Sequence, residues 1–435
     1  MQVSTEFTRT LDIRHVIERL LLSDLSNDDV VQYMSTILAD GRDSDENIAA
    51  HLRSIESSKD ALTRLLARPS ITQRTPAWYE ARMTMITASD IAQALGAGKF
   101  GTTKQFLWKK CLPAEGDTFA SLANCPPIKW GTMYEDVASA VYCARNRVHV
   151  HEFGLLQHPD IPHMGASPDG ITSLGVMLEI KCPYRRQITG EVPLQYFYQI
   201  QGQLEVCGLS DCDYLEIGLK ELGRDDFYDP DNILAMKGER GIVAEFIEDD
   251  KSRYEYSGVD GCVATLEAFE IAQRRANEAS EASQEEAIVA ATEEEGADAT
   301  VPEVVGKREV RLRFHYWRVD KYSCQRITRD AEFVAKMLPE IAAVWARVES
   351  YRKDPGLMEA EIGLPAFQEK KKRVLSYAFR EACTTDTTDT TGSSQVEPDE
   401  PPNPTVVSAK VKNTKKTKEK CIVQTSEEVP TYAFR

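Results

Sequence analysis

The sequence predicts an α/β domain preceded by a helical N-terminal extension and followed by a disordered C-terminal tail. Residues 1–70 carry apolar side chains at helical spacing. Residues 74–383 alternate helical patterns with short β-rich runs. Residues 384–435 are rich in Thr, Asp, Ser and Pro, a composition that does not support a packed core. The 435-residue chain is therefore expected to hold one large domain with appendages.

The N-terminal extension is expected to begin with two amphipathic helices. The apolar face of the first consists of Leu11, Val16, Ile17, Leu20 and Leu21. Ser26 and Asp29 are typical of the start of the second helix, and Gly41 of its end.

Within the α/β domain, the runs "VHVHEFGLLQH" and "DYLEIGL" predict strands. A segment at about 274–305 is acidic and rich in Ala and lacks aromatic residues, which indicates either a flexible insertion or a solvated helix. The sequence "REVRLRFHYWRVDKYSCQRITRD" then alternates like a strand. An amphipathic helix follows, with apolar residues Phe333, Met337, Ile341, Val344, Trp345 and Val348.

Composition argues against several classes of protein. A formal net charge of −17 argues against nucleic-acid binding through global charge, although a local basic groove is compatible with it. The ten cysteines form no C-x-x-C pair, which argues against a zinc ribbon or an iron–sulfur cluster and favours a reducing compartment. No secretory signal core and no run of about 18 apolar residues is present, so no membrane association is expected.

Two carboxylates and a lysine stand out in "PDGITSLGVMLEIKCP", which begins at Pro168. Side chains alternate along a strand, so Glu179 and Lys181 point to one face while Leu178 and Ile180 point to the other. A hairpin with its turn near residues 173–175 would bring Asp169 alongside Glu179. Two adjacent carboxylates repel unless a cation neutralises them, and oxygen ligands suit Mg²⁺, with Mn²⁺ as a substitute. A surface hairpin with a Glu–Lys salt bridge is the alternative.

Four blocks occur in a fixed order, and together they resemble a known family. They are "WYEARMTMITASD", "WGTMYED", "GASPDG…LEIKCP" and "YFYQIQGQLEVCG". The order resembles the lambda-exonuclease or YqaJ-type viral recombinase family, a branch of the PD-(D/E)XK nucleases related to herpesvirus-type alkaline nucleases. The resemblance covers roughly residues 75–220. It implies a restriction-endonuclease-like core, in which helices flank a central mixed β-sheet.

The resemblance also implies an activity and a set of site residues. The expected activity is Mg²⁺-dependent hydrolysis of double-stranded DNA from its ends, 5′→3′, in viral or phage-type recombination, repair or replication. Asp169, Glu179 and the Ile180 carbonyl would hold the metal with help from Glu135, and Lys181 would orient the water. A DNA virus inside its host cell is the expected source, and a single-strand annealing protein is a candidate partner. The oligomeric state is left open.

Arg82 and Ser89 form a candidate phosphate site. Arg82 lies one helical turn after Trp78, and Ser89 follows Thr87 at the expected start of a helix, where free N–H groups attract anions. The resemblance implies that Arg82 and Ser89 grip the terminal 5′ phosphate. Alternatively, Arg82 is a solvated helix residue and Ser89 a helix cap.

The fourth block predicts a helix beside the active site. Phe197, Ile200, Leu204 and Cys207 form its apolar stripe. The resemblance assigns Tyr196 to the DNA-binding residues, and Gln199 to contact with the attacking water or a phosphate. Gln201 is expected to point elsewhere, and the role of Gln203 is open. A solvated polar face is the alternative for all of them.

Three other functions remain open on the sequence. An endonuclease or structure-specific nuclease would keep the same fold. A non-catalytic DNA-binding scaffold is disfavoured by the complete Asp–Glu–Lys set, and an iron–sulfur nuclease is disfavoured by the cysteine spacing. In the tail, the basic tract Lys410–Lys420 is expected to be a nuclear-targeting or weak DNA-tethering element, or a plain solubilising segment.

Overall fold

The computed structural model describes residues 13–23, 25–37, 45–99, 101–112, 125–235, 238–249, 251–294 and 310–365. The chain divides into two compact units, Met1–Glu369 and Lys370–Arg435, and all described residues belong to the first. The predicted tail, with its basic tract Lys410–Lys420, lies outside the described residues. Among the helices of the described part, none is both long and apolar enough to cross a membrane.

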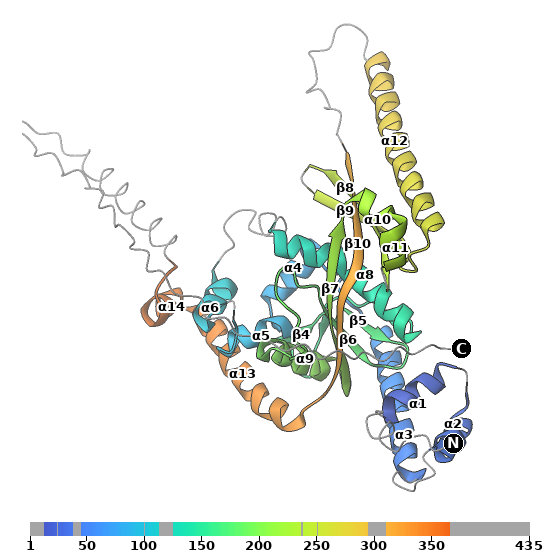
Figure 1. Cartoon of the computed structure of the whole chain (residues 1–435). Coiled ribbons are helices and arrows are strands. Elements are labelled where there is room, and N and C mark those ends of the chain that lie inside the picture. Colours follow the sequence, from blue (N-terminus) through green and yellow to red (C-terminus); the bar gives the residue numbers. More distant parts are fainter. Residues whose placement is uncertain are drawn as a thin grey trace, which may run out of the picture. The chain divides into compact units, whose positions relative to one another are not determined.

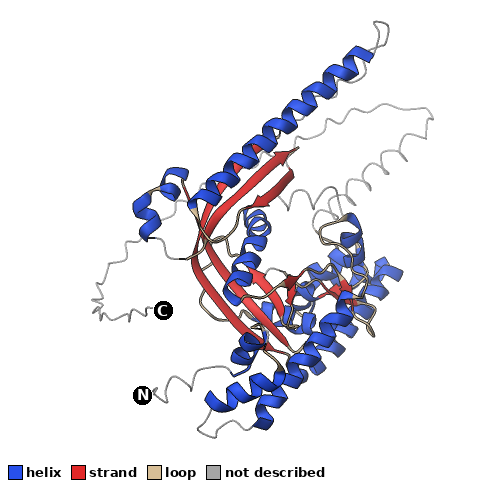
Figure 2. Ribbon diagram, turned by 90° about the vertical axis from the view of Figure 1, so that its right-hand side faces the viewer, coloured by secondary structure: helices blue, strands red, loops and turns tan. Residues whose placement is uncertain are grey.

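A mixed seven-stranded sheet is the centre of the fold, as predicted, and it curls strongly along its length (Figure 2). Its strand order is β2-β5-β6-β7-β10-β8-β9, and only the β6–β7 pair is parallel among these neighbours. The strands are β2 (Val150–His151), β5 (Gly170–Thr172), β6 (Met177–Lys181), β7 (Asp211–Leu222), β10 (Arg311–Thr328), β8 (Arg240–Glu248) and β9 (Lys251–Tyr256). A second sheet has the order β1-β4-β3, with β1 (Ile86–Thr87), β4 (Met164–Ala166) and β3 (Leu156–Gln157).

Helices cover both faces of the β6–β7 pair. On one face, α9 (Leu194–Cys207) packs Ile200 and Leu204 against Met177 and Tyr214. On the other face, α8 (Pro126–Asn146) packs its apolar side against Leu178, Ile180, Leu215 and Ile217. The predicted alternation of β6 is confirmed, since its even-numbered residues join the α8 core while Glu179 turns toward α9. One detail was not expected from the sequence: α9 covers Glu179, which is 0% exposed.

Further helices belong to the described part of the chain. They are α4 (Pro76–Met83), α5 (Ala88–Ala94), α6 (Thr103–Cys111), α10 (Arg224–Tyr228), α11 (Pro230–Ala235), α13 (Ala331–Lys353) and α14 (Pro355–Ile362). The predicted helix with Met337, Ile341 and Val348 is confirmed as α13, where these three side chains are buried.

The N-terminal extension is helical, as predicted, and it braces the β5–β6 hairpin. Its helices are α1 (Ile13–Leu21), α2 (Asn27–Ile37) and α3 (Asp45–Leu66), labelled in Figure 1. Leu174, in the hairpin turn, belongs to their apolar core. The turn lies where the sequence predicts it, and Gly175 there has φ +75°. A Cβ on Gly175 would lie 2.3 Å from the carbonyl oxygen of Ser58 in α3, so only glycine permits this close approach.

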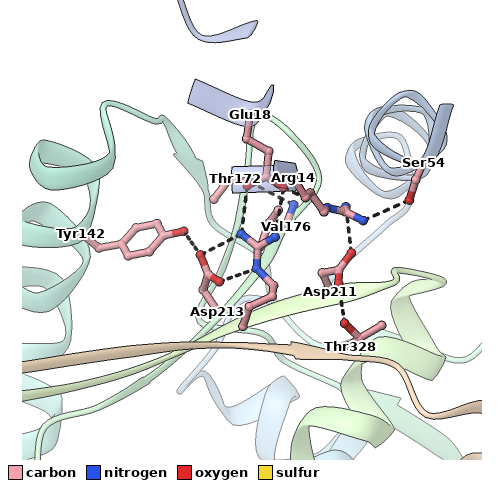
Figure 3. Close-up of polar contacts among 10 residues, drawn as sticks. Arg14, Glu18, Ser54, Tyr142, Thr172, Val176, Asp211, Asp213 and Thr328 are labelled. Carbon is pink, nitrogen blue, oxygen red and sulfur yellow. Dashed lines mark hydrogen bonds and ion pairs between the residues drawn. The ribbon is translucent and has the colours of Figure 1, made fainter. Parts of the chain in front are cut away.

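An ion-pair network joins the same extension to the sheet (Figure 3). Arg326 of β10 donates to both oxygens of Glu18, at 3.0 and 3.1 Å, and to Asp213 at 2.6 Å. Tyr142 donates to Asp213 at 2.6 Å. Arg14 pairs with Asp211 at 2.8 Å. The network links α1, α8, β7 and β10 around the base of the hairpin.

The acidic segment forms part of a long helix, α12 (Val263–Glu294), over its described residues. Of the two predicted alternatives, the helix is therefore the one found for this part, and it begins before residue 274. Leu266 anchors it by packing with Phe227, Ile242 and Tyr316. Residues 295–309 lie outside the described residues.

Candidate active site

The β5–β6 hairpin brings Asp169 and Glu179 to one end of the sheet. Asp169 directly precedes β5, and the backbone N–H of Ile180 donates to its Oδ2 at 2.7 Å. Burial raises the pKa of Asp169 well above its usual range, and the negative charges of Glu179 and Glu135 raise it further. The predicted meeting of these carboxylates therefore occurs, and their charges act on one another.

Glu179 is a fully buried carboxylate with three side-chain donors. Gln199 Nε2 donates to Oε1 and Gln203 Nε2 donates to Oε2, both at 2.7 Å. These two amides lie one turn apart on α9. Lys181 Nζ pairs with Oε1 from the same strand. The helix thus fixes both oxygens of the carboxylate.

Lys181 connects this carboxylate to the aromatic residue Tyr196. Its Nζ lies 5.0 Å from the centre of the Tyr196 ring. Burial lowers the pKa of Lys181, but the charges of Glu179 and Asp169 outweigh burial, and the resulting pKa lies above the usual lysine range. Lys181 is therefore a cation at neutral pH.

Glu135 faces the hairpin from α8 and lines two hollows. A cavity of about 460 Å³ is lined by Arg74, Glu135, Asp136, Asp169 and Ile180, among others. A second hollow of about 300 Å³ is lined by Glu135, Ile180, Lys181 and Cys182, among others. Burial raises the pKa of Glu135, although Arg74, whose Nη2 lies 2.8 Å from Glu135 Oε2, opposes the rise.

The donor set fits a hard divalent cation through its charge. Two acidic groups, Asp169 and Glu135, have raised pKa values partly because Glu179 lies near them, and a cation would relieve this repulsion. Within the described residues, no three His, Cys, Asp or Glu side chains converge as a ready-made metal cluster. A metal ion would therefore have to bind oxygens of Glu179 and Asp169 that already accept hydrogen bonds within the protein.

Arg82 and Ser89 also meet as predicted. Arg82 Nη2 donates to Ser89 Oγ at 3.0 Å, and the guanidinium lies 4.3 Å from the centre of the Trp78 ring. Trp78 Nε1 donates to Ser167 Oγ at 3.1 Å, two residues before Asp169. The Trp78 ring therefore links the Arg82–Ser89 pair to the hairpin. The cap of α5 is Thr87, so Ser89 is not the helix cap.

Four residues of the site had no assigned role in the sequence. Gln203 holds Glu179, and its spacing of four from Gln199 is the signal that points to it. Arg74 reaches Glu135 from a distant segment, and Asp90 and Lys110 lie beneath Arg82 and Ser89. No sequence pattern signals these last three residues.

Gln201 turns away from the site, as expected. Its side chain donates to the Thr328 carbonyl and accepts from the Asp330 backbone N–H. It therefore fastens α9 to the end of β10 and the start of α13.

Comparison with known proteins gives three findings. Residues 77–210 match the model of the YqaJ-like viral recombinase domain. The chain is 32% identical over 174 residues to uncharacterized protein R354 of Acanthamoeba polyphaga mimivirus, a match that covers 35% of this chain and 30% of R354. It is 25% identical over 213 residues to a protein of African swine fever virus (strain Badajoz 1971 Vero-adapted), a match that covers 39% of this chain and 60% of the viral protein. The chain therefore matches less than two thirds of the length of either relative.

Two solved structures are similar to this chain. One is an alkaline exonuclease (LHK-Exo) from Laribacter hongkongensis, with 19% sequence identity and a TM-score of 0.37. The other is LHK-Exo in complex with dAMP, with 19% identity and a TM-score of 0.36. Each comparison covers 66% of this chain and 100% of the solved chain.

Proposed function

We propose that this chain, whose residues 77–210 match the model of the YqaJ-like viral recombinase domain, is a metal-dependent DNA nuclease, and more narrowly a 5′→3′ exonuclease on double-stranded DNA. One observation carries the proposal. The carboxylate of Glu179 is fully buried, yet Lys181, Gln199 and Gln203 hold it, and it lies beside the buried carboxyl group of Asp169. Burial raises the pKa of Asp169, and a buried carboxyl group with a perturbed pKa is typical of a reaction centre.

The metal is proposed to be Mg²⁺, with Mn²⁺ as a substitute. Asp169, Glu179 and the Ile180 carbonyl would hold it, and Glu135 would assist from α8. When bound, such an ion would polarise the scissile phosphate and lower the pKa of the attacking water. Lys181 would orient that water and stabilise the charge that develops on the phosphate. Gln199 and Gln203 would keep Glu179 in its ligating orientation, as outer hydrogen bonds do at metal sites.

The substrate is proposed to be a duplex end. A terminal phosphate monoester carries up to two negative charges and an internal diester carries one. The Arg82 guanidinium and the Ser89 hydroxyl, 3.0 Å apart, favour the more charged group through charge-assisted hydrogen bonds. Tyr196, beside Lys181, would contact the DNA strand near the scissile bond. With the terminal 5′ phosphate bound there, hydrolysis would begin at the 5′ end, and we propose that it serves viral DNA recombination.

Purified protein incubated with Mg²⁺ and three DNA substrates tests the proposal. A 5′-labelled linear duplex should release mononucleotides, a 3′-labelled one should lose its label last, and a covalently closed circle should remain intact. Glu179→Gln should abolish release, whereas Glu332→Gln, at an exposed surface pair with Lys336, should leave it unchanged. Cleavage of the circle would instead identify an endonuclease of the same fold. Full activity in Glu179→Gln would contradict the assignment of Glu179 to the reaction centre.

A further inference from the structure

A buried lysine lies directly beneath the Arg82–Ser89 pair. Lys110 of α6 is 2% exposed, and its ammonium group contacts three acceptors. They are the carbonyl oxygens of Arg82 at 2.6 Å and of Met85 at 2.8 Å, and Asp90 Oδ2 at 3.0 Å. An ammonium group has three N–H donors, so Lys110 has none left for a ligand. It ties the end of α4 to the start of α5.

Asp90 completes a closed chain of contacts. It is 5% exposed, and its Oδ1 accepts from Lys109 at 3.1 Å. Its Oδ2 also accepts from the Thr87 hydroxyl at 3.0 Å, and that hydroxyl lies 3.2 Å from Ser89 Oγ. Ser89 in turn accepts from Arg82. Starting at Lys110, the chain therefore passes through Asp90 and Thr87 and reaches both phosphate-site residues.

The charges of Asp90 and the two lysines act on Arg82. Burial lowers the pKa of Lys110 to about 8, although Asp90 opposes this. Burial opposes ionisation of Asp90, but Lys110, Lys109 and Arg82 outweigh it and hold its pKa below the usual range. Without Lys110, only Lys109 would pair with the Asp90 carboxylate, and Asp90 would attract the Arg82 guanidinium more strongly. With Lys110 in place, Arg82 instead bonds to Ser89.

A gain in folding stability does not explain why the Lys110–Asp90 ion pair is buried. The desolvation cost of a buried ion pair roughly offsets the attraction between its charges, and apolar replacements of similar volume are often as stable. A second cation nearby, Arg352 of α13, already joins α4 to α6 by donating to the Met83 carbonyl at 2.6 Å and the Lys110 carbonyl at 2.7 Å. A positioning role explains the retained charges better than a stabilising one.

We propose that Lys110 and Asp90 are a positioning pair for recognition of the 5′ end: Lys110 occupies Asp90 and so leaves Arg82 and Ser89 free to bind a terminal phosphate. Neither residue touches the DNA. The inference rests on the proposed function, in which Arg82 and Ser89 anchor that phosphate. It predicts that the preference for a 5′-phosphorylated end depends on the charges of Lys110 and Asp90.

The test compares kcat and KM on duplexes that differ only in a 5′-phosphate or a 5′-hydroxyl. Lys110→Met should raise KM for the phosphorylated duplex about tenfold. Asp90 would then draw Arg82 away, and the charge-assisted contact between Arg82 and the 5′-phosphate would be lost. Its kcat at saturation and its KM for the hydroxyl duplex should stay near wild type. Lys110→Met with Asp90→Asn removes both charges and should restore most of the preference. Lys104→Met, an exposed lysine on the same helix, is the matched control.

The outcomes separate this inference from the function on which it rests. A wild-type enzyme without preference for the 5′-phosphate would contradict the assignment of Arg82 and Ser89. A wild-type preference that Lys110→Met keeps in full would overturn the positioning role, and so would a double variant no more selective than the single one. Should Lys110→Met fail to fold, Thr87→Val breaks the same chain of contacts between Asp90 and Ser89 and should lower the preference in the same direction.

Discussion

Gln203 donates from α9 to the second oxygen of Glu179, at 2.7 Å, one helical turn beyond the amide that holds the first oxygen. A carboxylate held at both oxygens keeps one orientation in a buried site. Helix α9 therefore supports the proposed reaction centre as well as the core, because its apolar side packs on β6 and β7.

Gln203→Met should slow DNA cleavage while the protein stays folded. Hydrogen bonds to charged groups contribute about 1.5–3 kcal/mol, so the single-turnover rate at saturating Mg²⁺ should fall about tenfold to a hundredfold. Gln201→Met is the control, since Gln201 on the same helix bonds Thr328 and Asp330 instead. Equal rates for wild type and Gln203→Met would show that Glu179 needs only one amide.

Gly175→Ala should destabilise the protein by loosening the hairpin from α3. Gly175 has φ +75°, and a Cβ there would lie 2.3 Å from the Ser58 carbonyl oxygen. Gly190→Ala isolates the backbone term, because Gly190 has φ +83° and a Cβ added there would meet no atom within 4 Å. Urea unfolding should show a loss of about 1–2 kcal/mol for Gly190→Ala and a clearly larger loss for Gly175→Ala. Equal losses of unfolding free energy in the two variants would mean that α3 moves away from the added Cβ at no cost in stability.

Arg326→Met should cost about 3–5 kcal/mol of unfolding free energy, the usual effect of removing one partner from a buried ion pair. Arg326 bonds Glu18 and Asp213, and both carboxylates are mostly buried. Arg145→Met is the comparison, because its pair with Glu239 is more exposed and should contribute at most about 1 kcal/mol. Denaturant titration at neutral pH measures both, and similar losses for the two variants would contradict the assigned difference.

His315 should make stability depend on pH. Its ring nitrogens lie 3.0 Å from Glu221 and from Glu245. Burial lowers the pKa of His315, but the two carboxylates outweigh it and the pKa lies above the ordinary 6.5. A raised folded-state pKa stabilises the fold fully below the unfolded value and loses that contribution as pH rises through the folded value. Thermal unfolding between mildly acidic and alkaline pH should therefore show a decline in wild type that His315→Gln lacks. Parallel pH profiles would contradict this.

Local periodicity made much of the site predictable. The alternation of β6 separated Glu179 and Lys181 from Leu178 and Ile180, and helical spacing excluded Gln201, whereas the family resemblance selected Gln199. Contacts between distant segments were not predictable, because nothing local encodes them. Arg326 meets Glu18 across 308 residues, and Lys110 meets Asp90 from a separate helix. The burial of Glu179 was missed for the same reason, since α9 covers it only after the sheet has formed.

Strand β10 has a consequence for how the protein unfolds. Its 18 residues pair with β8 through Arg311–Arg318 and with β7 through Tyr316–Thr328, so one continuous strand belongs to both ends of the curled sheet. The part of the sheet that carries α12 and the part that carries the proposed reaction centre therefore share strand β10. Neither part can lose its strand pairing without exposing an edge of the other. Cooperativity between the two is built into the connectivity, and the α12 region is not a module that can be cut away at its loops.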